Sequence, residues 1–277
     1  MGLMLRAQKN IMSKEVKETA SYEQVPASFI LQGISEGTIV IPKNVNRKLK
    51  KAVAVGRGLK TKVNANLGTS PDHISIKEEI EKMHVAVNAG ADAIMDLSTG
   101  GDLTCIRKEI LDQCPVCVGT VPIYQAACQT VRQKKKISQI DPEMMFDVIQ
   151  EQAEQGVDFM TVHCGVTRET VEILNRQPRH VGTVSRGGSF LVKWINANKK
   201  ENPYYQNYDR LLKIAKKYDI TLSLGDGFRP GCIHDASDGT QLAELSVLGE
   251  LVLRARAAGV QTMIEGPGHV PIDQIQT

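Results

Sequence analysis

At 277 residues the chain is long enough for one large α/β domain or two average ones. Its 42% hydrophobic content and 23 glycines suit a packed globular protein rather than a disordered one. A net charge of +3 and 4% aromatic residues argue against nucleic acid as a partner. No apolar run approaches the roughly 18 residues of a membrane span, and the N-terminus lacks a signal-peptide core, so we expect a cytoplasmic protein without membrane contact.

The first 55 residues are mixed and charged and end in a Lys-Leu-Lys-Lys run. We expect an N-terminal extension of short helices over residues 1–55, followed by β/α units over residues 56–277. Within the latter part, short β-prone runs alternate with stretches of helical periodicity. Seven such runs are present: 61–66, 93–98, 118–124, 159–163, 182–185, 221–226 and 262–265.

Two of the intervening helices have clear signals. Ile76, Ile80 and Met83 recur at helical spacing on one face, with acids and lysines on the others. Asp141 followed by Pro142 is a good helix start, since Asp caps the helix and Pro suits its first position. Seven β/α units in succession predict a parallel sheet covered by helices.

A polar residue stands at the carboxyl end of nearly every predicted strand. In a (β/α)₈ barrel of the TIM type these ends meet around one mouth, whereas in a doubly wound sheet only the switch-point strands carry such residues. The pattern therefore favours the barrel, here with about seven of eight units. Because an unclosed barrel exposes a large apolar surface, we expect the chain to be a fragment of a longer protein, without its eighth unit. The polar ends are Asn66, Ser98, Tyr124, His163, Ser185, Asp226 and Glu265.

Several long motifs carry a close resemblance to a known family. They are NANLGTS, GADAIMDLSTGGDL, VGTVPIYQA, GVDFMTVHCGVT, SRGGSF, LSLGDGFRPGCIHDASDGTQ and MIEGPGHVP. From about Ile41 to the last residue the chain resembles the phosphomethylpyrimidine synthases. These are radical S-adenosylmethionine enzymes, carbon–carbon lyases on a (β/α)₈ barrel. The resemblance implies conversion of aminoimidazole ribotide to 4-amino-5-hydroxymethyl-2-methylpyrimidine phosphate in thiamine biosynthesis, and a homodimer.

The resemblance also implies a set of substrate-binding residues, whose types fit a ribotide. A Ser-Arg-Gly-Gly-Ser loop offers N–H groups, hydroxyls and a guanidinium to a phosphate. Two carboxylates suit ribose hydroxyls or the amino group, although either could simply cap the next helix. Catalytic residues stay unassigned. The implied substrate contacts are Asn66, Met95, Tyr124, His163, Ser185, Arg186, Gly187, Asp226, Gly227, Phe228, Arg229 and Glu265.

For cofactors, the resemblance implies S-adenosylmethionine, zinc and a [4Fe-4S] cluster. His269 matches one of two zinc-ligand histidines, and a single imidazole does not complete a zinc site. We expect the second histidine and the CxxCxxxxC cluster ligands beyond residue 277, since none of the six cysteines fits that motif, and so expect this chain to be inactive alone. Cys114 and Cys117 form a CxxC pair that we interpret as structural thiols beside a strand.

Two departures from the family pattern leave alternatives open. Position 228 is Phe where the family usually has Leu, and Cys164 stands where Ala is expected. Both flank substrate contacts, so the product could instead be 5-hydroxybenzimidazole, as in anaerobic cobamide synthesis. A third hypothesis is a non-catalytic barrel that binds a ribotide phosphate. A metal-dependent aldolase is more distant, because no predicted strand ends in the lysine that a Schiff base requires.

Overall fold

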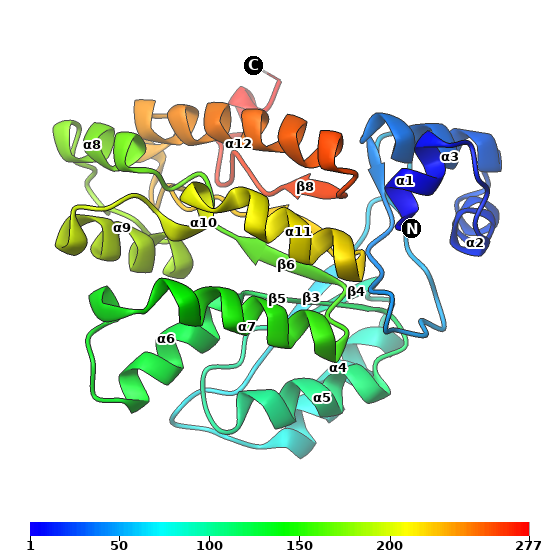
Figure 1. Ribbon diagram of the computed structural model, residues 1–277, viewed down its shortest axis with the longest axis horizontal. Coiled ribbons are helices and arrows are strands. Elements are labelled where there is room, and N and C mark those ends of the chain that lie inside the picture. Colours follow the sequence, from blue (N-terminus) through cyan, green and yellow to red (C-terminus); the bar gives the residue numbers. More distant parts are fainter. Residues whose placement is uncertain (277) are drawn as a thin grey trace.

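A six-stranded parallel sheet surrounded by helices forms the main body of the molecule, and a small helical unit lies beside it (Figure 1). The computed structural model describes residues 1–276. Within the sheet, the strands lie side by side in the order in which they occur along the chain. They are β3 (Asn64–Leu67), β4 (Ala93–Asp96), β5 (Cys117–Thr120), β6 (Phe159–Val162), β7 (Thr221–Leu224) and β8 (Thr262–Ile264).

Helices connect the successive strands and enclose the sheet, as Figure 1 shows. Because strand order never reverses, the right-handed crossovers all continue in one direction around the sheet, whereas in a doubly wound fold the direction changes at a switch point. Of the helices in residues 1–276, none combines the length and apolarity that crossing a bilayer requires. The helices are α4 (Ile76–Asn88), α5 (Leu103–Gln113), α6 (Pro122–Arg132), α7 (Pro142–Gln155), α8 (Arg168–Arg176), α9 (Arg186–Asn198), α10 (Pro203–Gln206), α11 (Tyr208–Tyr218) and α12 (Gly239–Ala258), with short 3₁₀ turns η1 (Ile137–Gln139), η2 (Ile233–Asp235) and η3 (Ile272–Gln274).

The sequence signals for α4 and α7 are confirmed. α4 begins after Ser75, whose hydroxyl accepts a hydrogen bond from the N–H of Glu78 at 3.3 Å. Its apolar face packs on the sheet, and Met83 is fully buried there. α7 begins after Asp141, whose carboxylate accepts from the N–H of Glu143 at 3.0 Å, with proline in the first turn. The α/β class with a parallel sheet is thereby confirmed.

One of the seven predicted strands is wrong. Residues 182–185 form no strand, and β6 pairs directly with β7. Gly182 adopts a left-handed conformation, with φ of 72°, that a regular strand does not accommodate. Ser185 is instead the N-cap of α9, where its hydroxyl accepts from the N–H of Gly188 at 3.2 Å. The local β-propensity of Thr-Val was outweighed by this helix start.

The N-terminal residues have a hydrophobic cluster of their own, separate from the one around the sheet. It includes the fully buried side chains of Ile30 and Ile34. Helices followed by a two-stranded antiparallel ladder surround it. Short helices at this end agree with the expected extension, while the division at residue 55 remains a prediction. The elements are α1 (Leu3–Gln8), α2 (Lys14–Glu23), α3 (Ala27–Glu36), β1 (Ile39–Val40) and β2 (Val55–Gly56).

Buried polar contacts attach this N-terminal unit to the main body. The side-chain amide of Gln261 accepts from the N–H of Ile41 at 2.9 Å and donates to its carbonyl at 3.2 Å. Asn44 donates from its amide nitrogen to the carbonyls of Ala153 and Val157, at 2.8 and 2.9 Å. Since buried backbone groups need partners, these side chains fix the unit at one place.

Candidate functional site

A cavity of about 410 Å³ opens where the strands of the sheet end at their carboxyl side. Its volume lies in the range of roughly 300–1,000 Å³ that is typical of small-molecule sites. Eight of the residues expected from the sequence line it, most of them near the carboxyl ends of strands or in the loops that follow. Tyr124, expected at the end of a strand over 118–124, instead lies in the first turn of α6, because β5 ends at Thr120 and Pro122 begins the helix. The lining residues are Asn64, Asn66, Met95, Leu97, Val121, Tyr124, Thr161, His163, Asp226, Arg229, Glu265 and His269.

Alternation along the strands explains two lining residues that the sequence analysis missed. Asn64 lies two positions before Asn66, and Thr161 lies two before His163, so each pair projects from the same face of its strand. The amide of Asn64 donates to the side-chain oxygen of Asn66 at 3.1 Å. The prediction names only the last polar residue of each strand, whereas the period of two along a strand places the polar residue two positions earlier on the same face.

Two carboxylates face the cavity, and of the two Asp226 is the buried residue. Glu265 accepts hydrogen bonds on Oε1 from the hydroxyls of Thr161, at 2.7 Å, and Ser223, at 3.0 Å. Asp226 forms an ion pair with Arg229, with 2.7 Å between Oδ1 and Nη1. Burial raises the pKa of both carboxyl groups, against the opposing effect of Arg229 and of the hydroxyls. These groups can accept hydrogen bonds from a ligand that carries hydroxyl or amino groups.

His163 is a buried, neutral imidazole in the wall of the cavity. Burial, and next the positive charge of Arg229, lower its pKa to about 3. Its Nε2 lies 3.3 Å from the hydroxyl of Ser185, and its Nδ1 has no partner within residues 1–276. A buried nitrogen without a hydrogen-bond partner is uncommon in folded proteins.

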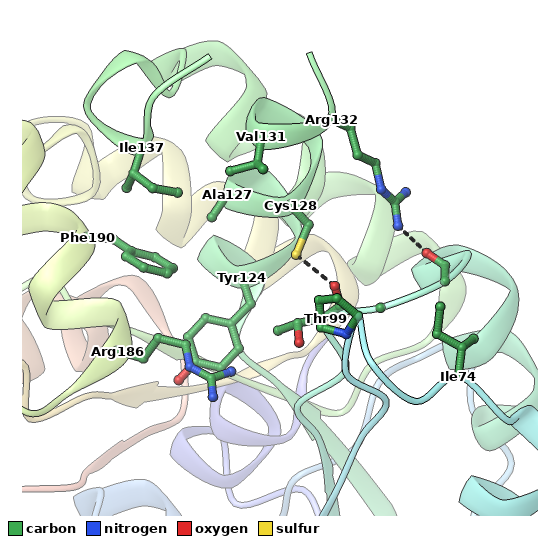
Figure 2. Close-up of a pocket in the computed structure, with 13 residues that line it drawn as sticks. Ile74, Thr99, Tyr124, Ala127, Cys128, Val131, Arg132, Ile137, Arg186 and Phe190 are labelled. Carbon is green, nitrogen blue, oxygen red and sulfur yellow. Dashed lines mark hydrogen bonds between the residues drawn. The ribbon is translucent and has the colours of Figure 1, made fainter. Parts of the chain in front are cut away.

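The Ser-Arg-Gly segment lies behind this wall and does not line the cavity directly. Gly187 packs on the imidazole, since a Cβ at that position would lie 2.2 Å from Cε1 of His163. Arg186 points instead into a neighbouring, mostly apolar cavity of about 540 Å³ (Figure 2). Its guanidinium lies 5.0 Å from the ring centroid of Tyr124, which lines both cavities. Tyr124 therefore connects the cavity that holds the two carboxylates with the one that Arg186 enters.

The segment after β7 contributes its ends and not its middle. Asp226 and Arg229 line the cavity, whereas Phe228 is fully buried on the other side. The backbone N–H groups of Gly227 and Phe228 both donate to the carboxylate of Glu244. Glu244 is not among the predicted site residues, although a charged residue on the buried face of a helix is a signal visible in the sequence.

The described residues do not supply a complete set of ligands for a metal ion. Nδ1 of His269 donates to the carbonyl of Pro230 at 2.7 Å, which leaves Nε2 free as a ligand atom. No group of three or more His, Cys, Asp or Glu side chains in residues 1–276 is arranged to hold a metal ion. Among the described residues, His269 is therefore the single expected zinc ligand, and zinc binding remains a prediction.

The cysteines also do not fit a cluster. All six are free, and burial raises the pKa of four of them: Cys114, Cys117, Cys128 and Cys164. A cluster needs several thiolates at one place, and residues 1–276 hold no group of three or more His, Cys, Asp or Glu side chains arranged to bind a metal. The interpretation of the CxxC pair as structural thiols agrees with this burial.

Comparison with known proteins gives one family over almost the whole chain. Residues 2–277 match the Radical SAM ThiC family. Proteins named phosphomethylpyrimidine synthase are 57% identical in Thermoanaerobacter sp., over 98% of this chain and 62% of the relative, and 54% identical in Geobacter metallireducens, over the same shares. The one in Carboxydothermus hydrogenoformans is 52% identical over 100% of this chain and 64% of the relative. The chain thus spans somewhat less than two thirds of these relatives.

Proposed function

Because this chain belongs to the Radical SAM ThiC family, we propose that it supplies the substrate-binding part of a phosphomethylpyrimidine synthase. Its ligand would be aminoimidazole ribotide, which the enzyme converts to 4-amino-5-hydroxymethyl-2-methylpyrimidine phosphate for thiamine. One observation carries the proposal. Eight residues that the family resemblance assigns to substrate or metal, from six separate segments of the chain, line a single cavity.

The polar groups of the cavity match the polar groups of a ribotide. Asp226 and Glu265 would accept hydrogen bonds from ribose hydroxyls or from the amino group, and Asn66 would add an amide. His163 would bond a ligand through its unpartnered Nδ1. Met95 would pack against the imidazole ring, as a polarisable thioether does.

The phosphate would lie near Tyr124, toward the N-terminus of α9. That helix has thirteen residues, and its N-terminal N–H groups and dipole favour an anion. Arg186 stands at its first position and is exposed, so its guanidinium is free to reach a phosphate. Arg229 would add a second guanidinium from the cavity that Tyr124 also lines. Ser185 and Gly187 would act indirectly, by holding His163.

Several finer statements belong to this proposal. A sheet with strands in sequential order is what a (β/α)₈ barrel contains, and we propose that architecture for the whole enzyme. S-adenosylmethionine and a [4Fe-4S] cluster would supply the radical for a lyase reaction, and the whole enzyme would be a homodimer. His269 fits one zinc position through its free Nε2. The six cysteines do not fit the cluster, so no role in it is proposed for them.

The benzimidazole alternative rested on Phe228 and Cys164. Both side chains are fully buried, and neither lines the cavity. Replacing Leu by Phe or Ala by Cys at these positions therefore leaves the ligand-facing surface unchanged. With this support removed, the pyrimidine product is the one that we retain.

The proposal is tested by titrating aminoimidazole ribotide into this chain in a calorimeter. We expect binding that weakens by about 10–100-fold in Arg229→Ala and in Arg186→Ala, since each removes a charge-assisted hydrogen bond. Arg254→Ala is the matched control, because Arg254 pairs with Asp209 on the surface. If neither test variant changes the affinity, the substrate and phosphate assignments are wrong.

Product analysis separates an enzyme from a binding protein. An anaerobic reaction of the chain within its full-length protein should yield the pyrimidine phosphate, identified by mass. Binding of the ribotide without any product would favour the non-catalytic alternative.

A further inference from the structure

Glu244 is a buried carboxylate in contact with the backbone of the segment after β7. It projects from the second turn of α12 and is 2% exposed. Its Oε1 accepts from the N–H of Gly227 at 2.8 Å, and its Oε2 accepts from the N–H of Phe228 at 2.9 Å. Both oxygens are therefore committed to two consecutive peptide groups, a charge-assisted pair of bonds.

The two residues held in this way stand between two that face the cavity. Asp226 precedes Gly227, and Arg229 follows Phe228. Only the two outer side chains line the cavity, where they form their ion pair. The direction in which each of them points depends on the peptide groups that Glu244 holds.

Close packing limits other positions for this carboxylate and segment. A Cβ on Gly165 would lie 2.7 Å from Cγ of Glu244, and one on Gly188 would lie 2.1 Å from the carbonyl oxygen of Gly227. Glycine at both positions lets the backbone approach this closely. The segment is thus enclosed between the Glu244 carboxylate and the start of α9.

We propose that Glu244 is a positioning residue, which holds Asp226 and Arg229 in the orientation that binds the ribotide. The inference rests on the proposed function for its ligand. It adds a residue that touches neither the cavity nor the substrate and acts through two backbone N–H groups. Its contribution is preorganisation, because a ligand site needs its contacts held to within about half an ångström.

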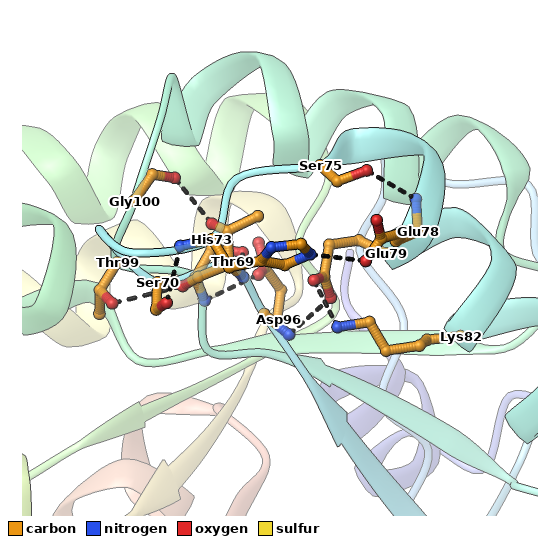
Figure 3. Close-up of polar contacts among 12 residues, drawn as sticks. Thr69, Ser70, His73, Ser75, Glu78, Glu79, Lys82, Asp96, Thr99 and Gly100 are labelled. Carbon is orange, nitrogen blue, oxygen red and sulfur yellow. Dashed lines mark hydrogen bonds and ion pairs between the residues drawn. The ribbon is translucent and has the colours of Figure 1, made fainter.

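The chain contains a matched comparison in Glu79 on α4. This carboxylate is 1% exposed, accepts from the N–H of Gly68 at 2.8 Å and pairs with Lys82 at 2.5 Å (Figure 3). It holds the segment after β3 much as Glu244 holds the one after β7. Residues 68–70, however, do not line the ribotide cavity. Glu79→Gln thus removes the same kind of contact from a segment that lies outside the lining of that cavity.

Protonation offers a readout that a merely structural residue would not give. Burial raises the pKa of Glu244 to about 8, with the two N–H bonds acting in the opposite direction. The charged groups that face it are Asp226, which raises the pKa, and Arg179, which lowers it. Only the ionised carboxylate accepts from both N–H groups without placing an O–H against one of them. Ribotide affinity of the unmodified chain should therefore rise between pH 7 and pH 9.

The experiment combines ribotide titration with hydrogen exchange measured by mass spectrometry on the same variants. In Glu244→Gln we expect affinity to fall at least about tenfold at pH 9, its rise with pH to disappear, and exchange to increase in residues 225–230. In Glu79→Gln, exchange should increase around residues 68–70, while the affinity and its pH profile stay as in the unmodified chain.

The outcomes separate the two proposals. If the unmodified chain does not bind the ribotide, the proposed function fails, while faster exchange in residues 225–230 of Glu244→Gln would still show that Glu244 holds the segment. If the chain binds and Glu244→Gln keeps both affinity and pH profile, the positioning role is overturned. Equal loss of affinity in the Glu79 and Glu244 variants would also overturn it, because the effect would then be general destabilisation.

Discussion

The hydroxyl of Thr161 donates a 2.7 Å hydrogen bond to Oε1 of Glu265, joining β6 to the segment after β8 across 104 positions of sequence. The bond lies in the wall of the candidate site and fixes one of its two carboxylates. Ser223 on β7 donates to the same oxygen at 3.0 Å. Three successive strands thus meet at a single carboxylate, which makes the orientation of Glu265 a property of the assembled sheet.

Removing this hydroxyl with Thr161→Val should weaken ribotide binding by about 2–10-fold, the effect of one neutral-to-charged hydrogen bond in a site that keeps the Ser223 contact. Calorimetry at pH 7.5 measures it. Thr221→Val is the matched control on the neighbouring strand, because the buried hydroxyl of Thr221 has no partner within residues 1–276. An unchanged affinity in Thr161→Val would show that Ser223 alone orients Glu265.

Enlarging Gly187 should disturb His163. The added Cβ of Gly187→Ala would lie 2.2 Å from the imidazole, a distance that requires the ring to move. We expect ribotide affinity to fall by more than tenfold and the free energy of unfolding to fall by about 1–3 kcal/mol. Gly249→Ala is the control, since nothing lies within 4 Å of its Cβ and alanine favours a helix. Wild-type affinity in Gly187→Ala would contradict the packing argument.

The buried imidazole of His163 should make stability fall in mild acid. Its pKa drops from 6.5 to about 3 in the folded chain, so below pH 6.5 the unfolded chain binds a proton that the folded chain does not. The contribution of this imidazole to the free energy of unfolding is therefore fully present above pH 6.5. It decreases by up to about 1.4 kcal/mol per pH unit as the pH falls toward 3. Urea unfolding of the chain and of His163→Gln at pH 7.5 and pH 5 measures this contribution of His163. Parallel losses in both would show that the imidazole is not responsible.

The N-terminal unit should loosen when Asn44 is replaced by alanine. The buried carbonyl of Val157 would lose this donor and that of Ala153 would keep only the N–H of Gly156, which costs roughly 2–4 kcal/mol in stability. Asn46→Ala is the control, because the amide of Asn46 makes a single exposed bond to Glu154 and its loss should cost less than about 0.5 kcal/mol. Urea unfolding followed by circular dichroism compares them. Equal stabilities would mean that the buried amide contributes little to attachment.

Hydrophobic periodicity and helix-capping residues predict much of the fold. The helix start at Asp141 and the apolar face that buries Met83 depend on residues a few positions apart, so the local sequence is sufficient. The same local reasoning failed at residues 182–185. There a β-prone pair of residues competes with an N-cap serine, and pairing between β6 and β7 decides between them.

The sequence predicts the α/β class, most of the strands and, through the family motifs, eight of the residues that line the cavity, because strand ends of a parallel sheet converge on one side. It did not determine how those side chains are held. The bond between Thr161 and Glu265 and the contact of Glu244 with the segment after β7 join residues on different elements. Such contacts form only when the sheet and its helices have packed, so only the tertiary structure decides them.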